Sequence, residues 1–153
     1  MTETHIGYQR PTDPALAALH EARVAFANEG YQPEECFTPP IADLEKPEMR
    51  FRVAQRGGRP VGMVALRLDP SGYGEVKALY IDEAARGAGL ARALMAEIED
   101  VARAEGVTLL RLETGIHHHG ALAFYPREGW HEIGRFDPYP PNDTSIFFEK
   151  RLD

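Results

Sequence analysis

A strand pattern, a glycine-rich turn and an amphipathic helix follow one another without interruption in residues 73–106, and this succession most restricts the folds open to the chain. The segment YGEVKALYID at 73–82 has the apolar spacing of a strand. Gly106 marks the end of the helix, whose apolar side chains recur at helical spacing at Leu90, Leu94, Ile98 and Val101. A strand that leads directly into a helix predicts a mixed α/β sheet.

Other segments extend this pattern on both sides. A hairpin is predicted at 49–69, turning at Gly57-Gly58, and single strands are predicted at 4–11, 107–115, 130–136 and 144–152. The apolar run at 107–115 is typical of a strand buried on both faces. Residues 31–48 contain four prolines and predict an irregular lid or short helical turns.

Two further helices complete the expected order β-α-β-β-β-α-β-α-β-β. Asp13 as N-cap and Pro14 at the first helical position begin a helix that ends at Gly30. Its apolar face is predicted to hold Leu16, Leu19, Val24 and Phe26. A shorter helical segment covers 121–125.

Length and composition narrow the class of protein. The 153 residues, with 43% apolar side chains, predict a single domain over 1–153 that buries its own core. A net charge of −7 without any basic run argues against a nucleic-acid partner and mildly favours a cationic amine as ligand. No apolar run approaches the roughly 18 residues of a membrane span, and no secretory signal is present, so we expect a cytoplasmic protein without a membrane partner. The sequence leaves the oligomeric state open, with the homodimer as the commonest assembly of soluble proteins.

The turn Arg86-Gly87-Ala88-Gly89-Leu90-Ala91 has the features of an anion site at a helix N-terminus. Free backbone N–H groups and the helix dipole favour phosphate there. Gly87 and Gly89 let the backbone approach a ligand, and Arg86 adds a positive charge. A plain tight turn is the alternative. No lysine follows a glycine as a P-loop requires, and Arg92 occupies the place of the small third residue of a dinucleotide fingerprint.

The same turn matches the pattern Arg/Gln-x-x-Gly-x-Gly/Ala. Together with EVKALYID before it and LETG and ALAFYPREGW after it, the chain resembles the GNAT superfamily of acyl-CoA-dependent N-acyltransferases, most strongly over Gly74–Trp130. This resemblance implies a GNAT-type α/β (α+β) fold, a mixed, mostly antiparallel central sheet flanked by helices. It also implies acetyl-CoA as co-substrate, with its pyrophosphate on the backbone of the turn. Its pantetheine arm and thioester carbonyl would then lie on backbone groups of Leu79, Tyr80 and Ile81.

Acetyl transfer to an amine needs a base for the nitrogen and a donor for the leaving thiolate. The resemblance implies Glu75 as base; an ordinary solvent-facing strand residue is the alternative. Glu113 is the second candidate, which otherwise binds the amine or caps the next turn. Tyr125 stands where the superfamily has its tyrosine donor, but Pro126 predicts that the helix is cut or kinked at Tyr125 and its hydroxyl misplaced.

Histidines and a late tyrosine supply further candidates. By the resemblance, His118 replaces an asparagine that binds the coenzyme arm, whereas His117 and His119 are equally well explained as a solvated turn. Consecutive helical positions point about 100° apart, so the three histidines do not predict a metal site. Tyr139, in a proline-rich loop, is a candidate contact to the acceptor.

These observations predict an N-acetyltransferase that moves an acetyl group from acetyl-CoA to a primary amine of a small molecule or peptide by direct attack in a ternary complex. A non-catalytic acyl-CoA sensor is the alternative from a different class. A protein-interaction domain whose glycine-rich turn has no ligand is a third. The sequence does not choose the amine.

Overall fold

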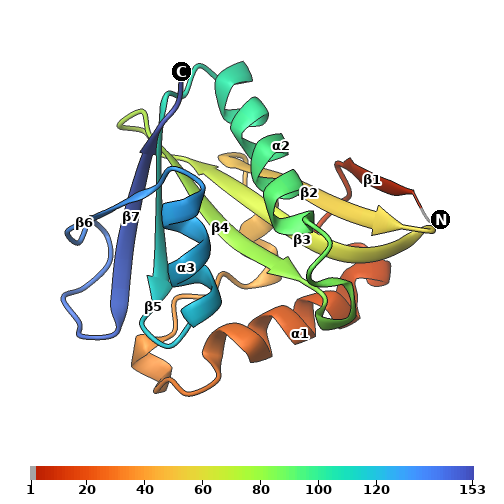
Figure 1. The fold of residues 1–153 in the computed structure, drawn as a ribbon, viewed down its shortest axis with the longest axis horizontal. Helices are drawn as coiled ribbons and strands as arrows, with labels where there is room; N and C mark the ends of the chain where they lie inside the picture. The colour runs from red at the N-terminus through yellow and green to blue at the C-terminus, as the bar shows by residue number, and fades with distance from the viewer. Residues whose placement is uncertain (1–2) are drawn as a thin grey trace.

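The computed structural model describes residues 3–153, which form a seven-stranded sheet with α-helices against both faces (Figure 1). The strands follow the order β1-β2-β3-β4-β5-β7-β6, and every neighbouring pair is antiparallel except β4 and β5. The predicted fold class is therefore confirmed. In chain order the elements are β1 (Thr4–Gly7), α1 (Ala17–Asn28), β2 (Met49–Arg56), β3 (Arg59–Leu68), β4 (Gly74–Ile81), α2 (Leu90–Ala104), β5 (Leu109–Gly115), α3 (His119–Arg127), β6 (His131–Ile133) and β7 (Ser145–Arg151).

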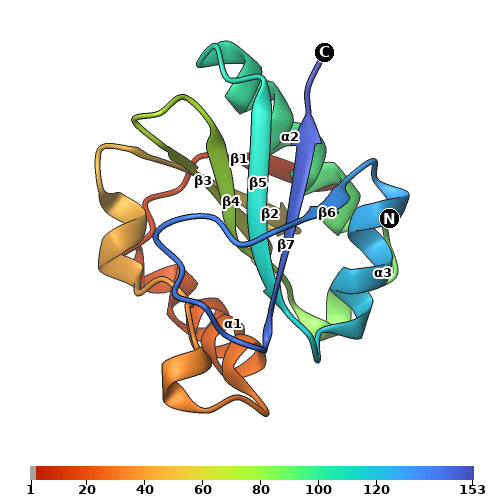
Figure 2. The same cartoon turned by 90° about the vertical axis from the view of Figure 1, so that its left-hand side faces the viewer.

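The helices divide between the two faces of the sheet. Helix α2 crosses β2, β3 and β4, and α3 lies beside it on the same face (Figures 1 and 2). Helix α1 and the short 3-10 turns Pro33–Glu35 and Ile41–Glu45 cover the opposite face. Residues 31–48 thus contain short helical turns, one of the two predicted alternatives. No helix among residues 3–153 is both long and apolar enough to cross a lipid bilayer.

Helix α1 buries a different face from the predicted one. Asp13 caps the preceding 3-10 turn Pro14–Leu16, accepting a hydrogen bond from Ala15 N at 2.9 Å. The side chains buried from this segment are Leu16, Leu19, His20 and Arg23. Phe26 is 45% exposed and Val24 is half-buried, so the predicted face that included them is wrong. The i, i+3, i+4, i+7 spacing decides which residues face the sheet, and it carries two polar side chains into the interior.

Helix α3 continues through Pro126 and ends at Arg127, so the predicted interruption at Tyr125 is wrong. Proline removes one helical hydrogen bond, but here the loss falls in the last turn. The carbonyl of Tyr125 accepts hydrogen bonds from the N–H groups of Glu128 and Trp130 at 3.0 and 3.1 Å. These bonds close the end of the helix, and the Tyr125 side chain is held in the core.

Strand β3, and not β5, has buried side chains on both faces of the sheet. Strand β3 contributes side chains to the apolar clusters beneath α2 and beneath α1. In β5, Leu110 and Leu112 belong to the core, whereas Arg111 and Glu113, which point to the other face, are only half-buried. The prediction for 107–115 is therefore wrong, because charged residues alternate with the apolar ones along this strand.

Candidate active site

The sheet contains a gap between β4 and β5. The two strands pair only at Gly74 and Glu75 of β4 and then diverge (Figure 1). Strand β4 also carries a β-bulge, since its register with β3 shifts just before Ala65 and Ala78 has a φ of 58°. A non-glycine residue rarely adopts a positive φ, so the bulge is a specific local distortion. The facing backbone groups of the two strands are left free to bind something other than each other.

A cavity of about 500 Å³ occupies this gap. Its walls are β4 from Val76 to Tyr80 and β5 from Leu112 to Gly115. Helix α1, the segment that follows it and the start of α3 enclose the sides. The volume suits a small-molecule site.

The glycine-rich turn leads from β4 into α2. Gly87 and Gly89 have φ values of 83° and 79°, which favour glycine, and a Cβ atom at either position would have no neighbour within 4 Å. No acidic side chain lies in the first turn of α2. Open backbone and a helix N-terminus without a competing carboxylate fit an anionic group such as a pyrophosphate. Arg86 is itself engaged: its Nε donates to Ile81 O at 3.0 Å, and its guanidinium lies 4.8 Å from the centre of the Phe26 ring.

Tyr125 lies on the wall of the cavity, 7% exposed, against Trp130 and Phe148. Burial raises the pKa of its phenol well above the ordinary value of 10.0. The hydroxyl is therefore protonated at neutral pH and can act as a donor toward the cavity.

Glu113 projects from β5 into the same cavity and is half-buried. Ser145 Oγ on β7 donates to Glu113 Oε2 at 2.6 Å. Burial raises the pKa of the Glu113 carboxyl, and the negative charge of Glu75 acts in the same direction, whereas Ser145 and Lys77 lower it. A carboxylate with a raised pKa in a cavity is a candidate proton acceptor.

Comparison with known proteins identifies the family. The model of the acetyltransferase (GNAT) family matches residues 16–130. The chain belongs to the GNAT family of acetyltransferases. An IAA acetyltransferase from Azospirillum brasilense is 37% identical over 153 residues, covering 99% of this chain and 100% of that protein. The crystal structure of a proposed acyl-CoA N-acyltransferase from Klebsiella pneumoniae is similar with a TM-score of 0.76 and 33% identity, over 98% of both chains.

The fold also matches an N-acetyltransferase solved with its ligand. The PaiA N-acetyltransferase from Thermoplasma acidophilum, in complex with coenzyme A, gives a TM-score of 0.75 at 15% identity and covers 98% of this chain and 99% of that chain. At that identity the likeness concerns the fold alone. The prediction of an acyltransferase enzyme is confirmed by the family match and the named relatives.

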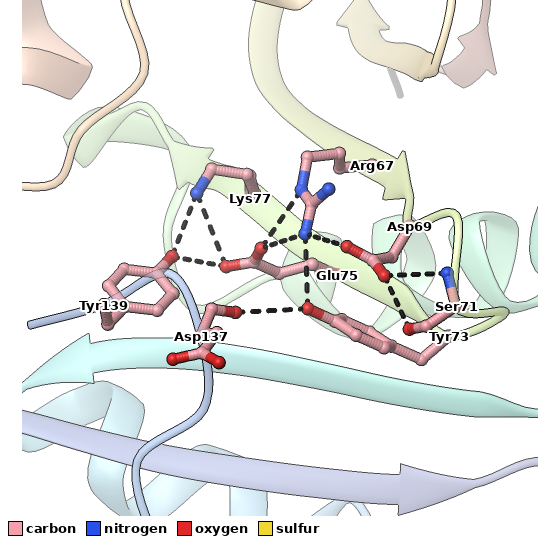
Figure 3. A network of polar contacts seen from close by, with 8 residues as sticks. All are labelled: Arg67, Asp69, Ser71, Tyr73, Glu75, Lys77, Asp137 and Tyr139. Carbon is pink, nitrogen blue, oxygen red and sulfur yellow. Dashed lines mark hydrogen bonds and ion pairs between the residues drawn. The ribbon is translucent and has the colours of Figure 1, made fainter.

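Glu75 of this GNAT protein is 1% exposed and does not line the cavity between β4 and β5. Figure 3 shows it surrounded by donors: Arg67 reaches Oε1 at 3.3 Å, and Lys77 Nζ lies 3.4 Å from Oε2. It faces a second cavity, next to the first. Two cations therefore stabilise its charge, and both of its oxygens already have partners.

Tyr139 joins the two cavities and lines both. Its hydroxyl donates a short hydrogen bond to Glu75 and accepts one from Lys77 Nζ at 3.0 Å (Figure 3). Burial, followed by the charge of Glu75, raises the pKa of this phenol. The two residues that the sequence singled out separately, Glu75 and Tyr139, thus form one hydrogen-bonded pair.

Two residues of the histidine triplet, His117 and His118, connect the β5–α3 loop to α1 and to Tyr31 after it. The Nε2 atom of His118 lies 3.2 Å from Ala27 O, and its ring lies 5.4 Å from that of Tyr31. The Tyr31 hydroxyl accepts a hydrogen bond from His117 N at 2.9 Å. His118 lines the cavity but is already bonded to α1. Within residues 3–153, no group of three His, Cys, Asp or Glu side chains is arranged to hold a metal ion.

Three residues that line the cavity or contact its lining were not predicted from the sequence. Lys77 and Ser145 contact the two predicted glutamates, and Arg23 lines the cavity from α1. The alternation of β4 signals Lys77 as a residue of the same strand face as Glu75. Arg23 follows Leu16 and Leu19 at helical spacing, which was the available signal for its burial. For Ser145 the sequence contains no such signal, because its hydrogen-bond partner Glu113 lies on a different strand.

Proposed function

We propose that this GNAT protein transfers an acetyl group from acetyl-CoA to a primary amine by direct attack in the cavity between β4 and β5. The observation that carries the proposal is the divergence of these strands around a cavity lined by both Glu113 and Tyr125. A proton acceptor and a proton donor are the two groups that the reaction requires.

The residues fit acetyl-CoA as co-substrate. The backbone of Gly87 to Ala91 would hold the pyrophosphate at the start of α2, and the unpaired edge of β4 at Leu79 and Tyr80 would hold the pantetheine arm. Bound acetyl-CoA supplies an activated acetyl thioester. Backbone N–H groups beside the bulge at Ala78 would polarise its carbonyl, an effect worth a few kcal/mol.

Glu113 is the base that the geometry supports. A primary amine with a pKa near 10.4 is almost entirely protonated at pH 7, and freeing its nitrogen costs about 4–5 kcal/mol. Glu113 reaches the cavity and has a raised pKa, so it can hold the proton that the amine releases. The negative charge of Glu75 is balanced by ion pairs with Arg67 and Lys77, and the side chain faces the other cavity. We assign Glu75 the role of positioning Tyr139 and Lys77 at the cavity wall.

Tyr125 is the donor that the geometry supports. Because its phenol is protonated at neutral pH, it can donate a hydrogen bond to the leaving sulfur. The helix passes through Pro126 without ending, which supports this role.

The test is thiol release from acetyl-CoA over a panel of primary amines, run on the wild type and on Glu113→Gln, Glu75→Gln and Tyr125→Phe. Release with one class of amine, lost in Glu113→Gln, is the expected result. Binding of acetyl-CoA without release for any amine would overturn the proposal in favour of a sensor. Loss of turnover in Glu75→Gln with Glu113→Gln active would reverse the assignment of the base.

A further inference from the structure

The most unusual group at the cavity is Arg23 on α1, a guanidinium that is 2% exposed. Its Nη2 donates to Pro39 O at 3.1 Å and lies 3.2 Å from Nδ1 of His20. Its Nε and Nη1 are buried with no hydrogen-bond partner among residues 3–153. Neither contact carries a negative charge.

The charge of Arg23 is therefore uncompensated. Arg67 and Lys77, nearby on the sheet, each have Glu75 as an ionic partner (Figure 3). Arg23 has no such pair in the part of the chain that the structure describes, and burial lowers its pKa to about 10. It still carries its charge at neutral pH, in a place where an unpaired charge destabilises the folded protein.

The position of Arg23 indicates which missing group would satisfy it. Arg23 lines the cavity from α1, together with Pro39 of the segment after α1 and Lys77 and Ala78 of β4. The proposed coenzyme contacts are Tyr125 on α3, the glycine-rich turn at the start of α2, and the edge of β4 at Leu79 and Tyr80, so none of them comes from α1. Arg23 thus lies on a part of the cavity wall, α1, that the proposed coenzyme contacts do not use and that the acceptor can occupy.

We propose that Arg23 binds an anionic group of the acceptor, so that the preferred acceptor is a primary amine that also carries a carboxylate or a phosphonate. This inference rests on the proposed acetyl transfer and specifies its substrate class. An amino acid has both groups, with the amine directed to Glu113 and the anion to Arg23. The net charge of −7 does not oppose this, because charges on the exposed surface are screened by salt.

The first experiment measures the free protein. Arg23→Met removes an uncompensated buried charge and keeps an unbranched apolar side chain, so the midpoint of thermal unfolding is expected to rise. Arg52→Met is the matched control, since Arg52 is half-buried on β2 and paired with Glu97 at 3.0 Å. The midpoint of that variant should fall or stay. A fall for Arg23→Met would mean that Arg23 is a structural residue and would overturn the inference.

The second experiment measures selectivity with matched acceptors. Leucine is paired with 3-methylbutylamine, phenylalanine with 2-phenylethylamine, and 2-aminoethylphosphonate with ethylamine. In the wild type, the anionic member of a pair should have the higher kcat/KM. In Arg23→Met that preference should fall about 30-fold or more, while the neutral amine keeps its rate. Preference for the carboxylate members or for the phosphonate distinguishes the two anions.

The outcomes separate the inference from the proposed function. An equal loss for both members of each pair would overturn the role of Arg23 while acetyl transfer stands. If no amine is acetylated, the proposed function fails, and the inference is judged by binding alone. An anionic acceptor must then raise the unfolding midpoint of the wild type and not that of Arg23→Met; the same rise in both would overturn it.

Discussion

Burial of the Glu113 side chain has a measurable consequence for the pH dependence of the enzyme. Because its pKa is raised above 4.5, kcat/KM should fall as the pH falls through that raised value and the base becomes protonated. Ser145→Ala removes a hydrogen bond that lowers this pKa. The acid limb of the pH–rate profile, where the rate falls as Glu113 becomes protonated, should therefore move to higher pH. A pH–rate profile of both proteins measures the shift; an unmoved limb would show that Glu113 is not the titrating group.

Replacement of Glu113 tests the base directly. Glu113→Gln should lower kcat by about 10²–10⁴ and remove the acid limb. The folded protein disfavours the charged carboxylate, so stability contributed by Glu113 is lost as pH rises between its unfolded and folded pKa values. Glu113→Gln should therefore unfold at the same or a higher temperature than the wild type at pH 7, which shows that the lost rate does not reflect misfolding.

Replacement of Glu75, which is paired with Tyr139, should have the opposite effects from replacement of Glu113: a loss of stability and an unchanged pH dependence of the rate. Glu75→Gln leaves Arg67 and Lys77 without their buried carboxylate, and should destabilise the protein by about 3 kcal/mol. The acid limb of the pH–rate profile should stay in place, because Glu75 does not take the proton. Urea denaturation measures the first effect and the kinetics the second. A stable variant that has lost the acid limb would contradict the assignment.

At the scale of elements, the two ends of α2 allow a matched test of the coenzyme site. Gly89 and Gly106 have φ values of 79° and 77°, and a Cβ atom at either position would have open space within 4 Å. Gly89→Trp and Gly106→Trp should therefore lose a similar stability, about 1–2 kcal/mol. Only Gly89→Trp should weaken acetyl-CoA binding, by about tenfold or more. Calorimetric titration measures both; equal affinities would contradict a site at the glycine-rich turn.

The contact between β5 and the segment after α1 gives a second test. A Cβ atom at Gly115 would collide with the Tyr31 hydroxyl, so Gly115→Ala must displace Tyr31 and break its hydrogen bond with His117 N. We expect a loss of about 1–3 kcal/mol in the free energy of unfolding and a lower rate. Gly120→Ala, in α3 with open space around it, should instead stabilise the protein by up to about 1 kcal/mol. Urea denaturation of the two variants decides between these signs.

For the molecule as a whole, the sheet is divided at β4 and β5. Only Gly74 and Glu75 of β4 pair across this border, whereas β3 pairs along its length with β2 and β4. Amides of Val76 to Tyr80 that face β5 should exchange with solvent much faster than those of β3, and acetyl-CoA should slow them. Native-state hydrogen exchange measures this. Equal protection of both sets without ligand would contradict the open border.

Local sequence signals predicted the elements of this fold well. Glycines and prolines mark where α1, α2 and the β2–β3 hairpin begin or end, and alternation marks the strands. The glycine-rich turn was recognisable because its chemistry is contained in consecutive residues. Predictions failed where the surrounding structure changed the effect of a local signal. Pro126 was predicted to interrupt its helix, but the hydrogen bond that it removes lies in the last turn of α3.

Side-chain partnerships were the part that the sequence did not predict. Tyr139 and Glu75 are 64 positions apart and meet only because the β6–β7 loop folds back over β4. The burial of Arg23 depends on which face of α1 meets the sheet, and an arginine is not read as a core residue from its type. The candidate base changed from Glu75 to Glu113 for the same reason, since the direction of each carboxylate depends on the divergence of two strands.

The open border between β4 and β5 also determines how reactants reach and leave the interior. Widening it breaks no β-ladder hydrogen bond within β1–β4 or within β5, β7 and β6, because each set keeps its own pairing. Passage of reactants at this border therefore requires no rupture of the pairing within either set of strands. Turnover in such a molecule should be sensitive to side chains that span the border.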